Sequence, residues 1–105
     1  MAFGYEIFTY FEGSWHTGNT AVIRAADHGA WLGSGVFDGA RYFDGVAPDL
    51  EAHCQRVNHS ARALGLVPSV EVAEMVEIAR EGLARFTPDQ AVYIRPMYWG
   101  IDGDV

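Results

Sequence analysis

The sequence VFDGARYF occupies residues 36–43, and the dipeptide Asp44-Gly45 follows it directly. Aromatic residues and valine are enriched in β-strands, and Asp-Gly is strongly favoured in the tight turns of hairpins. We therefore predict a strand over residues 36–43 that ends in a tight turn. Because side chains alternate between the faces of a strand, every second residue shares a face. One face carries Phe37, Gly39, Arg41 and Phe43, and the other carries Val36, Asp38, Ala40 and Tyr42.

Two amphipathic helices are predicted after this turn. Asp49 can cap the first helix, and Gly65 offers its C-terminal cap shortly before Pro68. Its apolar stripe is Leu50, Cys54, Val57, Ala61 and Leu64. Ser69 can cap the second helix, inside which Gly82 costs roughly 1 kcal/mol relative to alanine. The buried stripe of the second helix is Val72, Met75, Val76, Ala79, Leu83 and Phe86.

Strand-like segments flank this strand and the two helices on both sides. Residues 6–12 and 21–23 have strand composition, with a turn signal at Gly13-Ser14, whereas residues 27–35 contain three glycines and are expected to be irregular. Residues 91–101 return to strand character. Strands, two helices and then a strand predict an α+β fold, with a mostly antiparallel sheet and the two helices packed on one face.

Composition limits the classes of function. The length of 105 residues fits one domain, since independently folding units cluster at roughly 100–150 residues. Fourteen acidic and seven basic residues give a net charge of −7, which repels phosphate backbones and anionic lipid headgroups. The first residues lack the pattern of a secretory signal, and no apolar run approaches the ~18 residues of a membrane helix. We therefore expect a cytoplasmic protein that binds neither nucleic acid nor membrane.

The absence of one residue type bears on chemistry. All seven basic residues are arginines, so this chain alone cannot form a Schiff base between a side-chain amine and a carbonyl cofactor. Cys54 is the single cysteine, which excludes an internal disulfide, and no CxxC or HExxH motif is present. We therefore expect no metal site.

Three polar side chains lie where they could bind an anion. In the last strand, Tyr93 and Arg95 share a face opposite the apolar Val92 and Ile94, and that face could bind a carboxylate or simply be solvated. Arg56 lies on a flank of the first helix, away from both its apolar stripe and its solvent side. Its planar guanidinium suits bidentate binding of phosphate or carboxylate, and the alternative is a pair with a nearby acidic residue.

Four short motifs, taken together and in this order, resemble the N-terminal domain of the class IV aminotransferases. They are DHG at residues 27–29, GSGVFDGAR at 33–41, HCQR at 53–56 and YIRP at 93–96. Their span covers nearly the whole chain, and within the family the sequence is most similar to the branched-chain amino-acid group.

The resemblance implies a pyridoxal 5'-phosphate (PLP) enzyme of two domains, whose small N-terminal domain covers a cofactor held mainly by the larger C-terminal domain. Arg56 would bind the cofactor phosphate. Tyr93 and Arg95 would contribute to recognition of substrate carboxylates. The residues that would line or support the substrate pocket are Phe37, Gly39 and Arg41.

The lysine that carries the cofactor in this family belongs to the C-terminal domain. The resemblance therefore implies that residues 1–105 are the N-terminal domain without its C-terminal partner, with no catalytic residue of their own, and we expect this chain alone to be inactive. The expected reaction of the complete enzyme moves an amino group between a branched-chain or similar hydrophobic amino acid and 2-oxoglutarate, as in branched-chain amino-acid biosynthesis. We expect a homodimer or a higher homo-oligomer.

Departures from the family pattern keep alternatives open. Leu32 stands where branched-chain enzymes usually carry tyrosine, Asp38 replaces the usual glutamate, and Ala52 replaces another glutamate. Because the position of Leu32 belongs to the pocket wall, the alternatives on the same scaffold are a D-amino-acid aminotransferase, an amine transaminase or an aminodeoxychorismate lyase. An alternative of another class is a non-catalytic binding or assembly module, which the absence of lysine favours.

Overall fold

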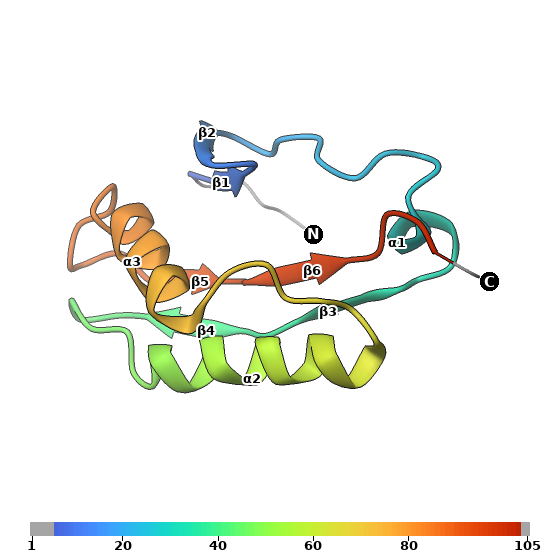
Figure 1. The fold of residues 1–105 in the computed structure, drawn as a ribbon. Helices are drawn as coiled ribbons and strands as arrows, with labels where there is room; N and C mark the ends of the chain where they lie inside the picture. The colour runs from blue at the N-terminus through green and yellow to red at the C-terminus, as the bar shows by residue number, and fades with distance from the viewer. Residues whose placement is uncertain (1–5, 104–105) are drawn as a thin grey trace.

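The computed structural model describes residues 6–103. All strand pairs in this part of the chain are antiparallel, and α2 and α3 are the long helices, as predicted for an α+β fold. Figure 1 shows α2 along the β3–β4 segment and the β1–β2 hairpin on the far side of β5–β6. The strands are β1 (Phe8–Phe11), β2 (Ser14–Thr17), β3 (Gly35–Phe37), β4 (Ala40–Tyr42), β5 (Val92–Ile94) and β6 (Met97–Trp99). The helices are α1 (His28–Trp31), α2 (Leu50–Leu64) and α3 (Val72–Leu83).

The long strands predicted at residues 36–43 and 91–101 are each divided in two, which corrects that prediction. β3 pairs with β6 and β4 pairs with β5 in the same register, so the four strands form one ribbon with a break in the middle. At the break, the backbone N–H of Asp38 still donates to the carbonyl of Pro96 at 3.1 Å. The return bond is missing because proline has no N–H. A single proline therefore explains the break.

Two tight turns, one after β4 and one between β1 and β2, use backbone with positive φ. Asp44 and Gly45 have φ values of 51° and 76°, and Phe43 and Val46 exchange both backbone hydrogen bonds across them at 3.0 Å. The tight turn predicted at Asp44-Gly45 is therefore confirmed. The turn between β1 and β2 is centred on Glu12 and Gly13, one residue earlier than predicted.

Two predictions for residues 21–35 are wrong. Residues 21–23 form no strand, and no backbone ladder pairs them with another described segment. Residues 27–35 are not wholly irregular, because one helical turn, α1, forms within them. Backbone N–H groups of His28 and Gly29 donate to the carbonyls of Ile101 and Gly100 at 3.2 and 2.9 Å. These long-range bonds hold α1 in place, and local sequence cannot reveal them.

The core lies between the ribbon and the two long helices. Ala40, Leu50 and Cys54 are buried together, and the apolar stripe of α3 packs against them. Ile94 packs on the same cluster, which confirms the predicted inward faces of both strands. The α3 residues in contact are Val72, Met75, Val76 and Ala79.

The predicted helix ends need three corrections. Asp49 occupies the N-cap position of α2 but has a left-handed backbone and makes no side-chain cap bond. α3 begins after Glu71, two residues later than a cap at Ser69 would place it. Phe86 lies beyond the end of α3, where its ring packs edge to face against Phe8 at 5.4 Å. The C-cap at Gly65 is confirmed, with a φ of 88°.

Gly82 allows the β1–β2 hairpin to pack on α3. A Cβ at Gly82 would lie 2.7 Å from Cζ2 of Trp15, so the indole fits only where the helix carries no side chain. The guanidinium of Arg85 lies 4.9 Å from the Trp15 ring and 5.7 Å from the ring of Phe8. Glycine is therefore required here by packing, despite its low helix propensity.

Candidate functional site

Five of the six predicted site residues lie on one side of the ribbon, which we call the outer face. Arg41 is paired with Tyr93, and Phe37 with Met97, while the same register places Gly39 opposite Arg95. The neighbouring inward residues Asp38, Ala40 and Tyr42 are buried, so alternation turns the outer face away from α2. The outer face consists of Phe37, Gly39, Arg41, Tyr93, Arg95 and Met97.

Tyr93 leans across the break in the ribbon. A Cβ at Gly39 would lie 2.9 Å from Cε1 and 3.1 Å from the hydroxyl oxygen of Tyr93. Only glycine leaves this space free for the phenol. The Tyr93 side chain is nevertheless 51% exposed, so its hydroxyl is available to a ligand.

The outer face combines cations with apolar surface. Within residues 6–103, neither Arg41 nor Arg95 forms an ion pair, and both are exposed. Phe37 is 58% exposed and Met97 lies opposite it, so apolar side chains lie beside the two guanidiniums. This arrangement suits a small molecule that carries both a carboxylate and a hydrocarbon side chain.

A groove of about 1500 Å³ lies between the β1–β2 hairpin, α3 and β5–β6. Arg41, Tyr93, Arg95 and Met97 of the outer face line it, together with His53 of α2. Phe37 and Gly39 are not among its lining residues. The groove therefore brings the cations and the phenol together, and leaves the Phe37 side chain outside.

Arg56, the sixth predicted residue, projects from α2 on the inner side of the ribbon. Its Nε and Nη2 donate to the two carboxylate oxygens of Asp38 at 2.6 and 2.8 Å. The Nδ1 of His53 lies 2.6 Å from the same carboxylate. The structure therefore contains the ion pair that sequence analysis gave as the alternative interpretation of Arg56, with Asp38 as the acidic residue.

Charge and burial differ strongly across this cluster. The side chain of Asp38 is 7% exposed and that of Arg56 is 65% exposed. Hydrogen bonds from Arg56, and then from His53, lower the pKa of Asp38 to about 2, against the opposing effect of burial. The same carboxylate raises the pKa of Arg56. Asp38 is therefore ionised throughout the neutral range.

The ion pair with Asp38 uses only some of the N–H donors of the Arg56 guanidinium. Of the five N–H groups in a guanidinium, two point at Asp38, and no other acceptor among the described residues takes the remaining three. The 3.3 Å approach to His53 Nδ1 involves an atom that already donates to Asp38. The exposed edge of Arg56 could therefore bind a phosphate group.

Strand alternation placed Asp38 correctly, but neither Asp38 nor His53 was assigned a role from the sequence. The available signal was strand alternation, which puts the charged Asp38 among inward-facing residues. A charged group on a buried face needs a partner. Identifying Arg56 and His53 as those partners required the packing of α2 on the ribbon.

Other polar groups are structural. Asp27 is also buried, and its carboxylate accepts hydrogen bonds from the backbone N–H of Arg24 at 3.0 Å and from the Trp99 indole at 3.2 Å. The hydroxyl of Tyr98 donates to Asn58, whose side chain donates to the Val70 carbonyl, at 2.9 Å each. These bonds fix α1 and the α2–α3 connection against β6.

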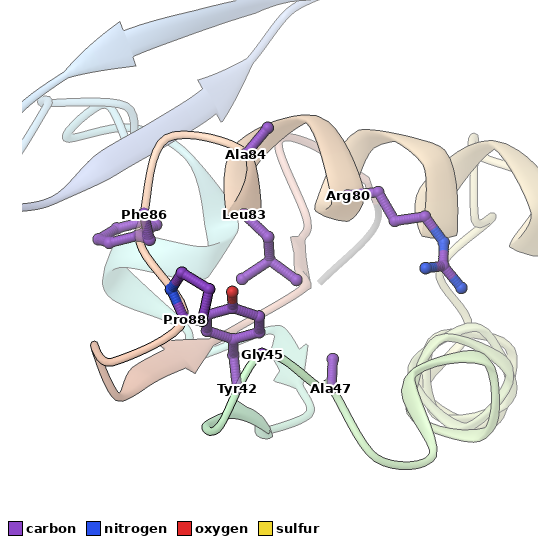
Figure 2. Close-up of a pocket in the computed structure, with 8 residues that line it drawn as sticks. All are labelled: Tyr42, Gly45, Ala47, Arg80, Leu83, Ala84, Phe86 and Pro88. Carbon is purple, nitrogen blue, oxygen red and sulfur yellow. The ribbon is translucent and has the colours of Figure 1, made fainter.

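A smaller pocket of about 320 Å³ lies at the end of α3 (Figure 2). Tyr42 points its hydroxyl towards Leu83, whereas the guanidinium of Arg80 points away from that phenol. Polar groups do not converge here, so this pocket is a poor candidate site.

Residues 6–103 contain neither a metal site nor a membrane-spanning helix. No group of three His, Cys, Asp or Glu residues is arranged to hold a metal ion in that range. None of the helices described there combines the length and apolar character needed to cross a membrane.

This chain is similar to known sequences over most of its length. Residues 35–105 match the model of the amino-transferase class IV family. A putative branched-chain-amino-acid aminotransferase from Methanocaldococcus jannaschii is 34% identical over 86 residues, which cover 82% of this chain and 30% of that protein. A probable branched-chain-amino-acid aminotransferase from Rickettsia bellii is 34% identical over 79 residues, covering 75% of this chain and 27% of that protein.

Solved structures give the same answer. An aminotransferase from Brucella abortus bound to PLP has 52% sequence identity and a TM-score of 0.92, over 95% of this chain and 36% of that one. A branched-chain aminotransferase from Thermoproteus uzoniensis with norvaline shares the fold at 23% identity, with a TM-score of 0.81, over 95% of this chain and 35% of that one. The chain thus spans about a third of the length of these relatives. This chain belongs to the class IV aminotransferase family, and its fold is that of the family's small N-terminal domain.

Proposed function

We propose that this chain is the N-terminal domain of a PLP-dependent transaminase acting on branched-chain or similar hydrophobic amino acids, with 2-oxoglutarate as the amino acceptor. The observation that carries the proposal is the outer face, where Arg41, Tyr93 and Arg95 converge beside apolar side chains. The printed names of the relatives from Methanocaldococcus jannaschii and Rickettsia bellii support the substrate class.

The residues present fit the cofactor. PLP has a phosphate group, and Arg56 offers three N–H donors on an exposed edge. When bound, PLP supplies an electron sink for bonds at the substrate α-carbon. Because this chain has no lysine, the amine that carries the cofactor would come from chain outside these residues. The proposed contribution of residues 1–105 is to bind the phosphate and to orient the substrate.

Substrate recognition follows from the composition of the outer face. Arg41, which is paired with Tyr93 in the ribbon, would bind the carboxylate that every substrate carries, and the hydroxyl of Tyr93 would donate a hydrogen bond to it. Arg95 would bind the second carboxylate of glutamate or 2-oxoglutarate. Met97, which lines the groove, would contact a hydrocarbon side chain, and Phe37 would extend this apolar surface outside the groove. Asp38 lies between Phe37 and Gly39 in the chain, so the ion pair of Arg56 and the outer face lie at the same level of the ribbon, on its two sides.

The remaining parts of the proposal concern assembly and location. We propose a homodimer or higher homo-oligomer in the cytoplasm, whose partners are amino acids, 2-oxo acids and the C-terminal domain of the same polypeptide. Light scattering of the complete protein would test the oligomeric state.

The substrate class is tested by supplying purified complete protein with PLP and 2-oxoglutarate. Leucine, isoleucine and valine are offered as amino donors beside D-alanine and an aromatic primary amine, and glutamate production is measured. We expect the branched-chain amino acids to react with the highest kcat/KM. Transfer from D-alanine or from the amine alone would contradict the substrate class, and no transfer from any donor would contradict the transaminase.

A further inference from the structure

We propose that Asp38 is a positioning residue that holds Arg56 in the orientation required to bind a phosphate group. This inference rests on the proposed function, in which Arg56 contacts the PLP phosphate. It adds the means by which the guanidinium is fixed before the cofactor arrives.

The Asp38 carboxylate accepts three short hydrogen bonds from one flank of α2. Arg56 supplies two of them, from Nε at 2.6 Å and from Nη2 at 2.8 Å, and His53 supplies the third at 2.6 Å. Strand alternation and the break at Pro96 place Asp38 inward, where its side chain is 7% exposed. The carboxylate is therefore a fixed point on the ribbon to which α2 is tied.

The contact selects which edge of the guanidinium faces outward. Asp38 occupies the Nε edge and one N–H of Nη2, which leaves both N–H groups of Nη1 and the second of Nη2. An unpaired arginine would sample many rotamers and would lose that freedom on binding. Here the geometry is set in advance, in the planar fork that matches a phosphate.

His53 completes the cluster without competing for Arg56. An ionised carboxylate can only accept hydrogen bonds, so the 2.6 Å contact requires a proton on Nδ1 of His53. A protonated Nδ1 cannot accept from Nη2 of Arg56, which lies 3.3 Å away. Among residues 6–103 the guanidinium is therefore held by Asp38 alone, and His53 steadies the carboxylate from the other side.

The test is a double-mutant cycle on cofactor binding in the complete protein. The dissociation constant of PLP is measured by titration of the apo-protein for wild type, Asp38→Asn, Arg56→Ala and the double variant. We expect Asp38→Asn to raise this constant about tenfold when Arg56 is present, and less than about twofold when Arg56 is replaced by alanine. A carboxylate that merely stabilises the fold would raise it equally in both backgrounds.

Asp27→Asn is the matched control, because Asp27 is an equally buried, hydrogen-bonded carboxylate that does not contact Arg56. We expect it to leave the dissociation constant within about twofold of wild type. Arg56→Lys is a second variant in case Asp38→Asn does not fold. It keeps the charge but cannot span both carboxylate oxygens, so its constant should lie nearer that of Arg56→Ala than that of wild type.

The outcomes separate this inference from the proposed function. If Arg56→Ala raises the dissociation constant but Asp38→Asn does not, or if Asp38→Asn acts equally in both backgrounds, the positioning role is overturned and phosphate binding by Arg56 stands. A wild-type constant for Arg56→Lys would also overturn the positioning role. If Arg56→Ala leaves PLP binding unchanged, the phosphate contact and the positioning role both fail.

Discussion

Gly39→Ala should impair substrate binding while leaving the fold almost intact. The added Cβ would lie 2.9 Å from Cε1 of Tyr93 and 3.1 Å from its hydroxyl oxygen, so one of the two groups must move. The phenol is the free end of a side chain that is 51% exposed, and it can swing away from the ribbon. We therefore expect the free energy of unfolding to fall by less than about 1 kcal/mol, below the usual cost of overpacking a rigid core.

The functional cost of this substitution should be larger. Moving the phenol of Tyr93 removes one hydrogen bond to the substrate carboxylate, and hydrogen bonds to charged groups are worth about 1.5–3 kcal/mol. This corresponds to a KM for the amino acid that is raised about tenfold or more. Steady-state kinetics with leucine, combined with urea unfolding of the same preparation, measure both effects.

Gly35→Ala is the matched control for this experiment. Gly35 lies in the same ribbon, but a Cβ there meets no atom closer than 3.4 Å. We expect its KM to equal that of wild type. The reasoning would be refuted if Gly39→Ala kept a wild-type KM, or if it lost several kcal/mol of stability, because the phenol would then be either irrelevant to the substrate or locked in the core.

Two other predictions concern stability. The pKa of Asp38 is about 2 in the folded protein, below the ordinary value of 3.8, so its ion pair stabilises the fold fully above about pH 4 and is lost as the pH falls towards 2. Over that interval the free energy of unfolding of wild type should fall by up to about 2 kcal/mol more than that of Asp38→Asn, and parallel pH curves from chemical denaturation would contradict this. Gly82→Ala should destabilise by up to about 2 kcal/mol, because a Cβ would meet Trp15 and overpacking outweighs the gain of ~1 kcal/mol in helix propensity. In a Trp15→Ala background the same substitution should instead stabilise the protein by up to about 1 kcal/mol, because the clash is gone and the helix propensity of alanine remains. A stabilised single variant would show that the indole does not pack as described.

Local pattern predicted the inward and outward faces of the strands and most of the stripes of the helices, because alternation and helical periodicity are properties of short segments. The exceptions are Leu64, which is 50% exposed, and Phe86, which lies beyond α3. Local pattern also placed Arg56 on a distinctive flank of its helix. It could not divide the strand at Asp38, since the cause is a proline on the opposite strand. For the same reason Gly82 looked unfavourable, because Trp15, which needs the space, is far away in the sequence.

Local pattern also grouped the predicted site residues only in part. Alternation grouped Tyr93 with Arg95 and grouped Phe37, Gly39 and Arg41, but only strand pairing could bring these two sets together. Three-dimensional packing was likewise needed to join the carboxylate on the inner face to α2. The substrate and cofactor roles of these residues remain predictions from the family resemblance.

The central claim is that two arginines of this chain have different tasks, with Arg56 binding the cofactor phosphate and Arg95 binding a substrate carboxylate. The most direct measurement is the PLP dissociation constant of the complete enzyme together with both half-reactions, for Arg56→Ala and Arg95→Ala. Arg62→Ala serves as control, because Arg62 is exposed on the same helix as Arg56 and forms no ion pair among the described residues.

We predict that Arg56→Ala weakens PLP binding about tenfold to a hundredfold for every substrate, since a charge-assisted contact is lost whichever amino acid reacts. Arg95→Ala should retain PLP and raise KM mainly for glutamate and 2-oxoglutarate, whose second carboxylate needs a cation that leucine does not. Wild-type PLP binding in Arg56→Ala, or equal impairment of leucine and glutamate in Arg95→Ala, would contradict this division of roles.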